Sequence, residues 1–92
     1  MTDPNSEAWD ELQWATRFRD RLVFKEDKVY VGQLVFKYDD ATYEWTPYWV
    51  VSEDDGLYEL VSAYGVERVE GVSADKLGVA VSATGATYRE SH

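Results

Sequence analysis

Aromatic and acidic side chains are the groups of this sequence that could bind a ligand. It holds eighteen Asp and Glu residues against nine Lys and Arg, a net charge of −9, together with four Trp and seven Tyr. Between residues 31 and 77, runs rich in Tyr and Trp alternate with acidic turns at 39–40 and 53–55. The face of an aromatic ring attracts a cation, and a nearby carboxylate adds to this attraction. The pattern therefore predicts a surface that binds positively charged groups.

Side chains suited to catalysis are few. The only histidine is His92, the last residue of the sequence, where we expect no fixed geometry, and there is no cysteine. A Ser-His or Cys-His relay is therefore not expected, and no GxxxxGK or GxGxxG loop is present to hold a phosphate. A carboxylate pair for glycoside hydrolysis needs a deep cleft that a small barrel does not offer. We expect no enzyme activity and no cofactor.

The acidic clusters at 39–40 and 53–55 are also candidate metal ligands. Calcium takes roughly six to eight oxygen ligands, and neither cluster has the loop pattern of an EF-hand. The alternative is that both are turns, in which short acidic side chains accept hydrogen bonds from the local backbone. The sequence favours turns, and we expect no metal site.

The negative charge is concentrated in the middle of the chain. Residues 24–82 carry twelve acidic and five basic side chains, a balance of −7, whereas residues 1–23 carry −2 and the last ten residues are neutral. Binding to a phosphate backbone requires a basic surface, which is the opposite sign. We therefore expect no direct nucleic-acid binding and predict a protein or basic peptide as partner. The alternative is that the acidity serves only solubility or a salt-rich cytoplasm.

The length of 92 residues fits a single domain, 1–92. The N-terminal segment is acidic and lacks the apolar run of a signal peptide, and no stretch approaches the roughly 18 apolar residues of a membrane span. Together with the absence of cysteine, this predicts a soluble intracellular protein without membrane contact, cytoplasmic or nuclear, that is a monomer or a weak homo-oligomer.

A helix is predicted over residues 6–22, after a flexible lead-in at 1–5. Its apolar residues repeat at helical spacing and fall on one stripe, and acidic residues near its start and arginines near its end complement the helix dipole. Trp9 and Trp14 flank this stripe on opposite sides. Both could pack on the rest of the molecule, and one left exposed could contact a partner.

After a charged connector at 24–28, apolar residues recur at every second position, which is typical of strands. Gly32 predicts a bulge or bend, Pro47 an edge or bulge position, and Asp55-Gly56 a tight hairpin turn. A single helical turn is expected at 73–77, and the tail 83–92 either adds an edge strand or is mobile. The five expected strands cover residues 29–38, 43–52, 57–63, 66–72 and 78–82.

Five short strands and one helix leave few arrangements. A mainly β fold, in which residues 28–82 form a five-stranded antiparallel barrel preceded by the N-terminal helix, buries the apolar faces best. The alternative is an open antiparallel α+β sheet with the helix packed on one face.

The middle of the chain also resembles the Tudor family of SH3-like barrels, over about half of its length. The matching features, in order, are Val31-Gly32, Tyr38, Asp39-Asp40, Trp45, Asp54-Asp55-Gly56, Tyr64-Gly65 and Leu77. The resemblance implies a barrel and an aromatic box for methylated Arg or Lys, with Tyr38, Trp45 and Tyr64 as walls. Val61 and Val66 stand where the family has a fourth aromatic residue and an Asn, so the box departs from the family pattern.

Three functions remain open. The first is a non-enzymatic interaction module that binds a cationic peptide or basic protein. Its candidate residues are Tyr38, Trp45 and Tyr64 with Asp39, Asp40, Glu44, Asp54 and Asp55. The second is an acidic inhibitor that mimics nucleic acid, of the phage or immunity type, whose carboxylates would be Asp39, Asp40, Glu44, Glu53, Asp54, Asp55, Glu59, Glu67 and Glu70. The third is a structural subunit that assembles through Trp9 and Trp14.

Overall fold

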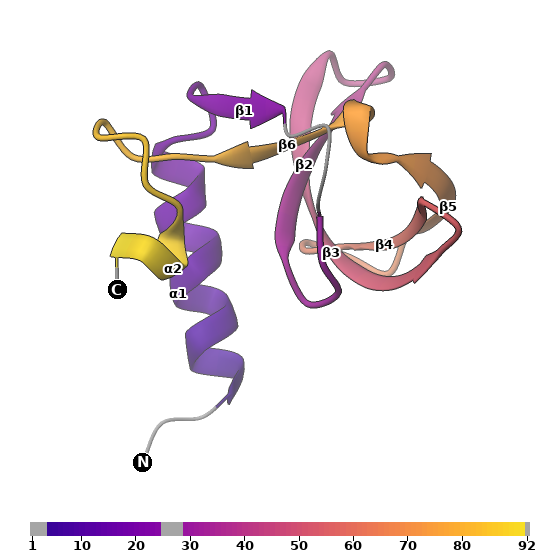
Figure 1. The fold of residues 1–92 in the computed structure, drawn as a ribbon, viewed down its shortest axis with the longest axis horizontal. Coiled ribbons are helices and arrows are strands. Elements are labelled where there is room, and N and C mark those ends of the chain that lie inside the picture. The colour runs from indigo at the N-terminus through magenta and orange to yellow at the C-terminus, as the bar shows by residue number, and fades with distance from the viewer. Residues whose placement is uncertain (1–3, 25–28, 92) are drawn as a thin grey trace.

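The computed structural model of the protein describes residues 4–24 and 29–91. Figure 1 shows a long N-terminal helix beside a strongly bent sheet. None of the helices within the described residues is long and apolar enough to cross a membrane. The elements are α1 (Pro4–Arg17), β1 (Leu22–Phe24), β2 (Leu34–Asp39), β3 (Glu44–Asp54), β4 (Leu57–Ser62), β5 (Arg68–Ser73), the 3₁₀ helix η1 (Ala74–Lys76), β6 (Leu77–Ala80) and α2 (Tyr88–Ser91).

The strands form one six-stranded sheet in the order β1-β6-β2-β3-β4-β5, and all neighbours are antiparallel. The expected mainly antiparallel β fold with one N-terminal helix is therefore confirmed. The number of strands was wrong, because β1 adds a sixth. Among the described residues the edge strands β1 and β5 do not pair with each other, so the sheet is open and closure into a barrel is not confirmed.

The helix was predicted too long. It begins at Pro4 instead of residue 6 and ends at Arg17 instead of residue 22. Beyond Arg17 the backbone tightens, because Phe18 donates its N–H to the carbonyl of Ala15 at 3.0 Å and Arg21 donates to Phe18 at 2.8 Å. Leu22 then pairs with Ala80 of β6. It still packs beside the helix against the same core, which explains why its spacing resembled a continued helical stripe.

The first long strand was also predicted too early. It begins at Leu34 instead of residue 29, because Gly32 has φ +93° and lies in a turn in which Gln33 donates to the carbonyl of Tyr30 at 3.1 Å. Of the bulge or bend predicted at Gly32, the bend is therefore confirmed, while a register shift occurs in β3 between Val50 and Ser52. The turn places Gly32 beside β3, since its N–H donates to the carbonyl of Val50 at 2.7 Å.

Pro47 lies in β3, opposite Phe36 of β2 and beyond the β3–β4 ladder, so the edge position predicted at this point is confirmed. It is tolerated there because pairing with β4 only begins at the next residue, Tyr48. The tight turn at Asp55-Gly56 is confirmed, with φ +54° and +80° in a two-residue hairpin loop.

The helical turn expected at 73–77 is confirmed as η1, while the tail forms the short helix α2 and not an edge strand. The remaining strands lie within two residues of their predicted ends. Of the lead-in predicted at 1–5, Pro4 and Asn5 belong to α1 instead, and residues 1–3 lie outside the described residues, as do the connector residues 25–28 and His92.

Two apolar cores lie on the two faces of the sheet. In β2 the side chains alternate, so that Val35 belongs to one core while Leu34 and Phe36 belong to the other. The inner core, enclosed by the bend of the sheet, contains Val29, Val35, Tyr48, Val50, Tyr58, Leu60, Val72, Leu77 and Val79. The helix-side core contains Leu12, Ala15, Leu34, Phe36 and Ala80, with Trp14, Phe18, Leu22, Trp45, Trp49 and Ala63 packed against it. Strands β2 to β6 all contribute to the inner core, which requires the sheet to curl around it.

Candidate functional site

Three aromatic rings from three strands lie together on the helix side of the sheet. Trp45 lies 5.2 Å from Phe24 and 5.5 Å from Tyr38 between ring centroids, with interplanar angles of 58° and 68°. Such tilted and edge contacts are favourable for aromatic pairs. We call Phe24, Tyr38 and Trp45 the aromatic cluster.

Strand pairing positions each ring of the aromatic cluster. Tyr38 and Trp45 are directly opposite in the β2–β3 ladder, so their side chains lie on the same face. Phe24 reaches that face because β1 pairs with β6, where its partner is Gly78. A Cβ atom on Gly78 would lie 3.0 Å from the Cβ of Leu22, so glycine at this position lets β1 approach β6 closely.

The aromatic cluster lines an open hollow of about 400 Å³, together with Lys37, Asp40, Asp75 and Lys76. We call it the aromatic hollow. Phe24 is 46 % exposed and Tyr38 is 38 % exposed, so both rings remain accessible to a partner. The hydroxyl of Ser73 donates to the Asp75 carboxylate. The hollow thus combines ring faces with two carboxylates, which suits a cationic group, while its two lysines make the rim neutral overall.

Tyr64, the third predicted wall, is not part of the aromatic cluster. It lies in the β4–β5 loop, is 64 % exposed and makes no ring contact with any described aromatic residue. The place of a third ring is taken by Phe24, which was predicted to belong to the charged connector. The signal that could have identified it is the run Leu22-Val23-Phe24, which is rich in strand-forming residues.

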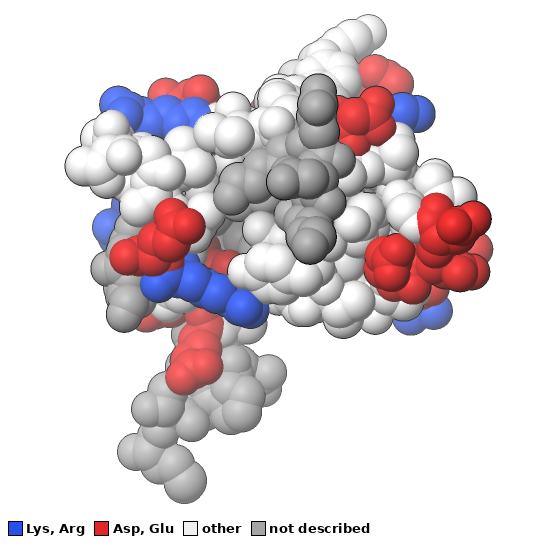
Figure 2. Space-filling model, viewed as in Figure 1, with Lys and Arg blue, Asp and Glu red and all other residues white. Residues whose placement is uncertain are grey.

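A second hollow, of about 340 Å³, lies at the far end of β3 between β3, β4 and β5. Its lining includes Asp54, Glu59 and Glu70, and the hairpin residues Glu53 and Asp55 are adjacent in sequence. We call these five residues the acidic end. Figure 2 shows a compact group of acidic side chains on the right of the molecule, over the region where β4 and β5 lie in Figure 1.

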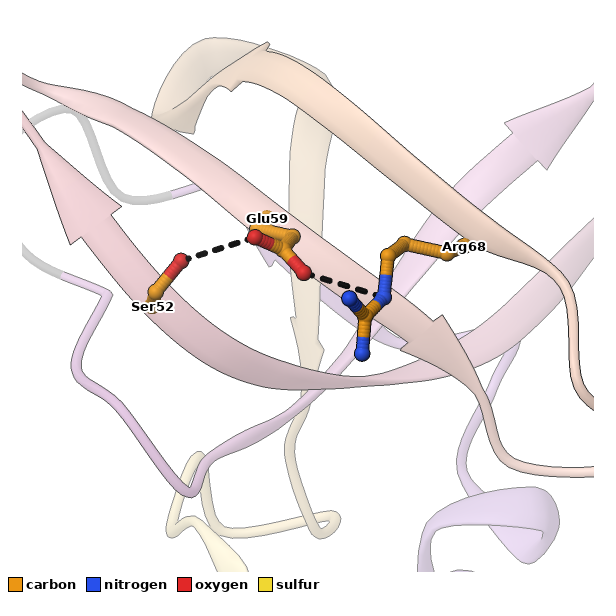
Figure 3. Close-up of polar contacts among 3 residues, drawn as sticks. All are labelled: Ser52, Glu59 and Arg68. Atoms are coloured by element: carbon orange, nitrogen blue, oxygen red, sulfur yellow. Dashed lines mark hydrogen bonds and ion pairs between the residues drawn. The ribbon is translucent and has the colours of Figure 1, made fainter.

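Polar contacts hold part of the acidic end in place. Glu59 accepts a hydrogen bond from the Ser52 hydroxyl at 3.2 Å and forms an ion pair with Arg68 at 3.0 Å, so that it connects β3, β4 and β5 (Figure 3). Glu53 accepts a hydrogen bond from the N–H of Gly56 at 3.0 Å within the hairpin. Glu59 is thus neutralised locally, whereas no ion pair joins Asp54 or Glu70 to a described basic residue.

Of the other predicted acidic residues, Glu67 lies in the β4–β5 loop, and the remaining three lie near the β2–β3 turn, beside the aromatic cluster. Asp39 accepts the N–H of Ala41 on its side chain at 2.9 Å and the N–H of Tyr43 on its carbonyl at 2.8 Å, which confirms that 39–40 is a turn. Asp40 lines the aromatic hollow, and Glu44 begins β3 with an exposed side chain. Within residues 4–24 and 29–91 no three His, Cys, Asp or Glu side chains come together as a metal site.

The two helix tryptophans occupy different environments. Trp14 packs against Phe18 and Tyr88, with ring centroids at 4.9 and 5.6 Å, and contributes to the helix-side core. Trp9 is 57 % exposed. Of the two residues predicted as helix contacts for a partner, Trp9 is therefore the accessible one.

Comparison with known proteins gives no relative: no family model, no curated protein and no solved structure matches this chain.

Proposed function

We propose that this protein is a non-enzymatic interaction module that binds a cationic peptide segment of a partner protein in the aromatic hollow. The observation that carries the proposal is the aromatic cluster itself. Trp45 contacts both other rings, Phe24 and Tyr38 are each more than a third exposed, and Asp40 and Asp75 lie in the same hollow.

A cationic ligand would gain binding free energy from the exposed rings in two ways. A Lys or Arg side chain over the face of a Trp or Tyr ring gains about 0.5–2 kcal/mol, more as water is excluded. Covering exposed rings also removes apolar surface from water. Because the rings are held by strand pairing, a ligand need not order them, which lowers the entropy cost of binding.

The acidic end would contribute mainly to the rate of association. Its carboxylates lie on an exposed hairpin and its flanks, where water and salt screen them and single ion pairs are weak. A negative region of this kind attracts basic partners over a distance of about one Debye length, roughly 8 Å at physiological salt. Recognition in the aromatic hollow and attraction by the acidic end are therefore separate tasks.

We infer further that strands β2 to β6 correspond to an SH3-like unit. Two observations support this: β6 returns beside β2, and all five strands surround one inner core. The Tudor-like order of motifs is compatible with this arrangement, although the second ring that contacts Trp45, Phe24, comes from β1, outside the resembling segment.

Calorimetric titration with short peptides tests the proposal. Three Gly/Ser peptides of equal length would carry a central Arg, a central Lys or a central Glu. We expect binding of the Arg or Lys peptide and none of the Glu peptide. Equal binding of all three peptides, or no heat at millimolar peptide with either cation, would contradict the proposal.

A second candidate function, mimicry of nucleic acid, is supported only by the acidic end. Its carboxylates could occupy a basic site on a nucleic-acid-binding protein. Of the remaining predicted mimic residues, Asp39, Asp40 and Glu44 lie at the other end of β3 and Glu67 lies in the β4–β5 loop, so the array is divided. Competition between this protein and DNA for a basic protein at low salt would support mimicry if Glu70→Lys abolished it and Trp45→Ala did not.

A further inference from the structure

A third hollow of the described residues is larger than the two described above. It has a volume of about 670 Å³ and lies where α1, the turn at 30–33, β3 and α2 meet. Small-ligand sites typically have volumes of about 300–1,000 Å³. We call this hollow the helix cleft; its lining residues are Glu7, Ala8, Glu11, Gly32, Trp49, Tyr88 and Arg89.

The walls of the helix cleft are held in place by packing. Trp49 is opposite Leu34 in the β2–β3 ladder and packs against the helix-side core, so its indole ring is fixed. On the other side, α2 is held by the contact between Trp14 and Tyr88 and by the guanidinium of Arg89, which lies 4.7 Å from the ring centroid of Tyr30. The cleft is therefore formed before any ligand binds.

The charges lining the cleft are unequal. Glu7 and Glu11 are four residues apart on α1 and therefore neighbours on one helix face. Arg89 is the only basic residue in the lining, so the balance is one negative charge in excess. Glu11 is half-buried, and burial raises its pKa although Arg89 acts in the opposite direction. Burial also raises the pKa of Tyr88, and Asp10, Glu11 and Glu7 raise it further, which indicates a negative potential in this region.

We propose that the helix cleft binds an alkylammonium group. The Trp49 ring would cover the alkyl stem, and the carboxylates of Glu7 and Glu11 would accept hydrogen bonds from the ammonium head. An ammonium group has three donors that point in different directions, which suits two separate carboxylates, whereas a planar guanidinium pairs best with a single one. Because it uses other residues, this site does not depend on the proposed function of the aromatic hollow.

Two sources could present this chemistry, a lysine side chain of a peptide or a free amine. Titration of ¹⁵N-labelled protein with N-acetyl-lysine methylamide and with 1,5-diaminopentane distinguishes them, with N-acetyl-norleucine methylamide as the uncharged control. We expect the Trp49 indole N–H resonance to shift with at least one cation and not with norleucine. Tighter binding of the lysine derivative assigns the site to peptides, and tighter binding of the diamine assigns it to free amines.

Variants with matched charge changes test the assignment. Glu11→Gln is expected to weaken binding about tenfold, equivalent to about 1.4 kcal/mol, while Asp20→Asn, an exposed acid in the turn at 18–20, should change it less than about twofold. The dispersion of the amide spectrum confirms that both variants are folded. Equal effects of the two substitutions, equal binding of norleucine, or no Trp49 shift at millimolar cation would overturn the proposal.

Discussion

The aromatic hollow and the hollow at the acidic end have similar volumes, but their residues come together in different ways. They lie at the two ends of β3, which contributes Trp45 to one and Asp54 to the other. The aromatic hollow needs three strands and the β1–β6 pairing to bring its rings together, whereas much of the acidic end follows from one hairpin. Rigid, partly exposed rings can distinguish ligands, while exposed carboxylates mainly set the strength and range of attraction.

This difference predicts that single substitutions in the aromatic hollow will strongly change the affinity for a cationic peptide. Single substitutions at the acidic end should instead change the association rate.

Replacement of the central ring should have the largest effect. We expect Trp45→Ala to weaken binding of a cationic peptide about 30-fold, or about 2 kcal/mol, because it removes the ring that contacts both others. Tyr64→Ala serves as the matched control and should change the affinity less than about twofold, since Tyr64 lies outside the cluster. Calorimetry measures both. Because Trp45 also packs on the helix-side core, the more exposed Tyr38→Ala provides a second variant that should weaken binding without unfolding.

Charge reversal at the acidic end should act on the association rate. Glu70→Lys is expected to slow association with a basic partner about fivefold at low salt, and the difference should disappear near 0.5 M salt because exposed charges are then screened. Asp20→Lys is the matched reversal outside both hollows. Stopped-flow fluorescence gives the rates. If Glu70→Lys instead changed the dissociation rate and kept its effect at high salt, the acidic end would be a binding site in its own right.

A backbone substitution can perturb the acidic end alone. Gly56 has φ +80°, so Gly56→Ala should lower the free energy of unfolding by about 1 kcal/mol, whereas Gly65, which has an ordinary φ and open space around it, should tolerate Ala with little change. Urea denaturation measures the difference. Amide shifts that spread from the hairpin to the aromatic cluster would show that the two regions are not independent.

Loss of the ion pair should have the smallest effect. Arg68→Ala removes the partner of Glu59, and because the Arg68 side chain is exposed to solvent we expect a loss of less than about 1 kcal/mol in stability. The freed carboxylate makes the acidic end more negative, so association with a basic partner should become slightly faster. Slower association would contradict the role given to these charges.

Local sequence signals predicted the parts of the fold that depend on few residues. The Asp55-Gly56 turn, the helical turn before Leu77 and the antiparallel strands all follow from backbone preferences within a short segment. The end of α1 was missed because Leu22 continues the apolar spacing of the helix while its backbone is extended in β1. The spacing of apolar residues identifies which side chains face the core. It cannot distinguish a side chain that reaches the core from a helix from one that reaches it from an adjoining strand.

The candidate site was predicted in part for a related reason. Tyr38 and Trp45 were both identified, and their contact follows from the β2–β3 register. Phe24 was not, because its position depends on pairing with Gly78, more than fifty residues away in the chain. Tyr64 was selected by its order in a family pattern, and such a pattern does not fix where a loop side chain points.

The central claim is that a cationic side chain binds at the aromatic cluster. The most direct measurement is an NMR titration of labelled protein with an Arg- or Lys-containing peptide, in unmethylated and methylated form, that follows the Trp45 indole N–H and the ring resonances of Phe24 and Tyr38. We predict saturable shifts of all three residues, with Tyr64 unchanged. Shifts confined to the acidic end, or none at these three rings at millimolar peptide, would contradict the claim.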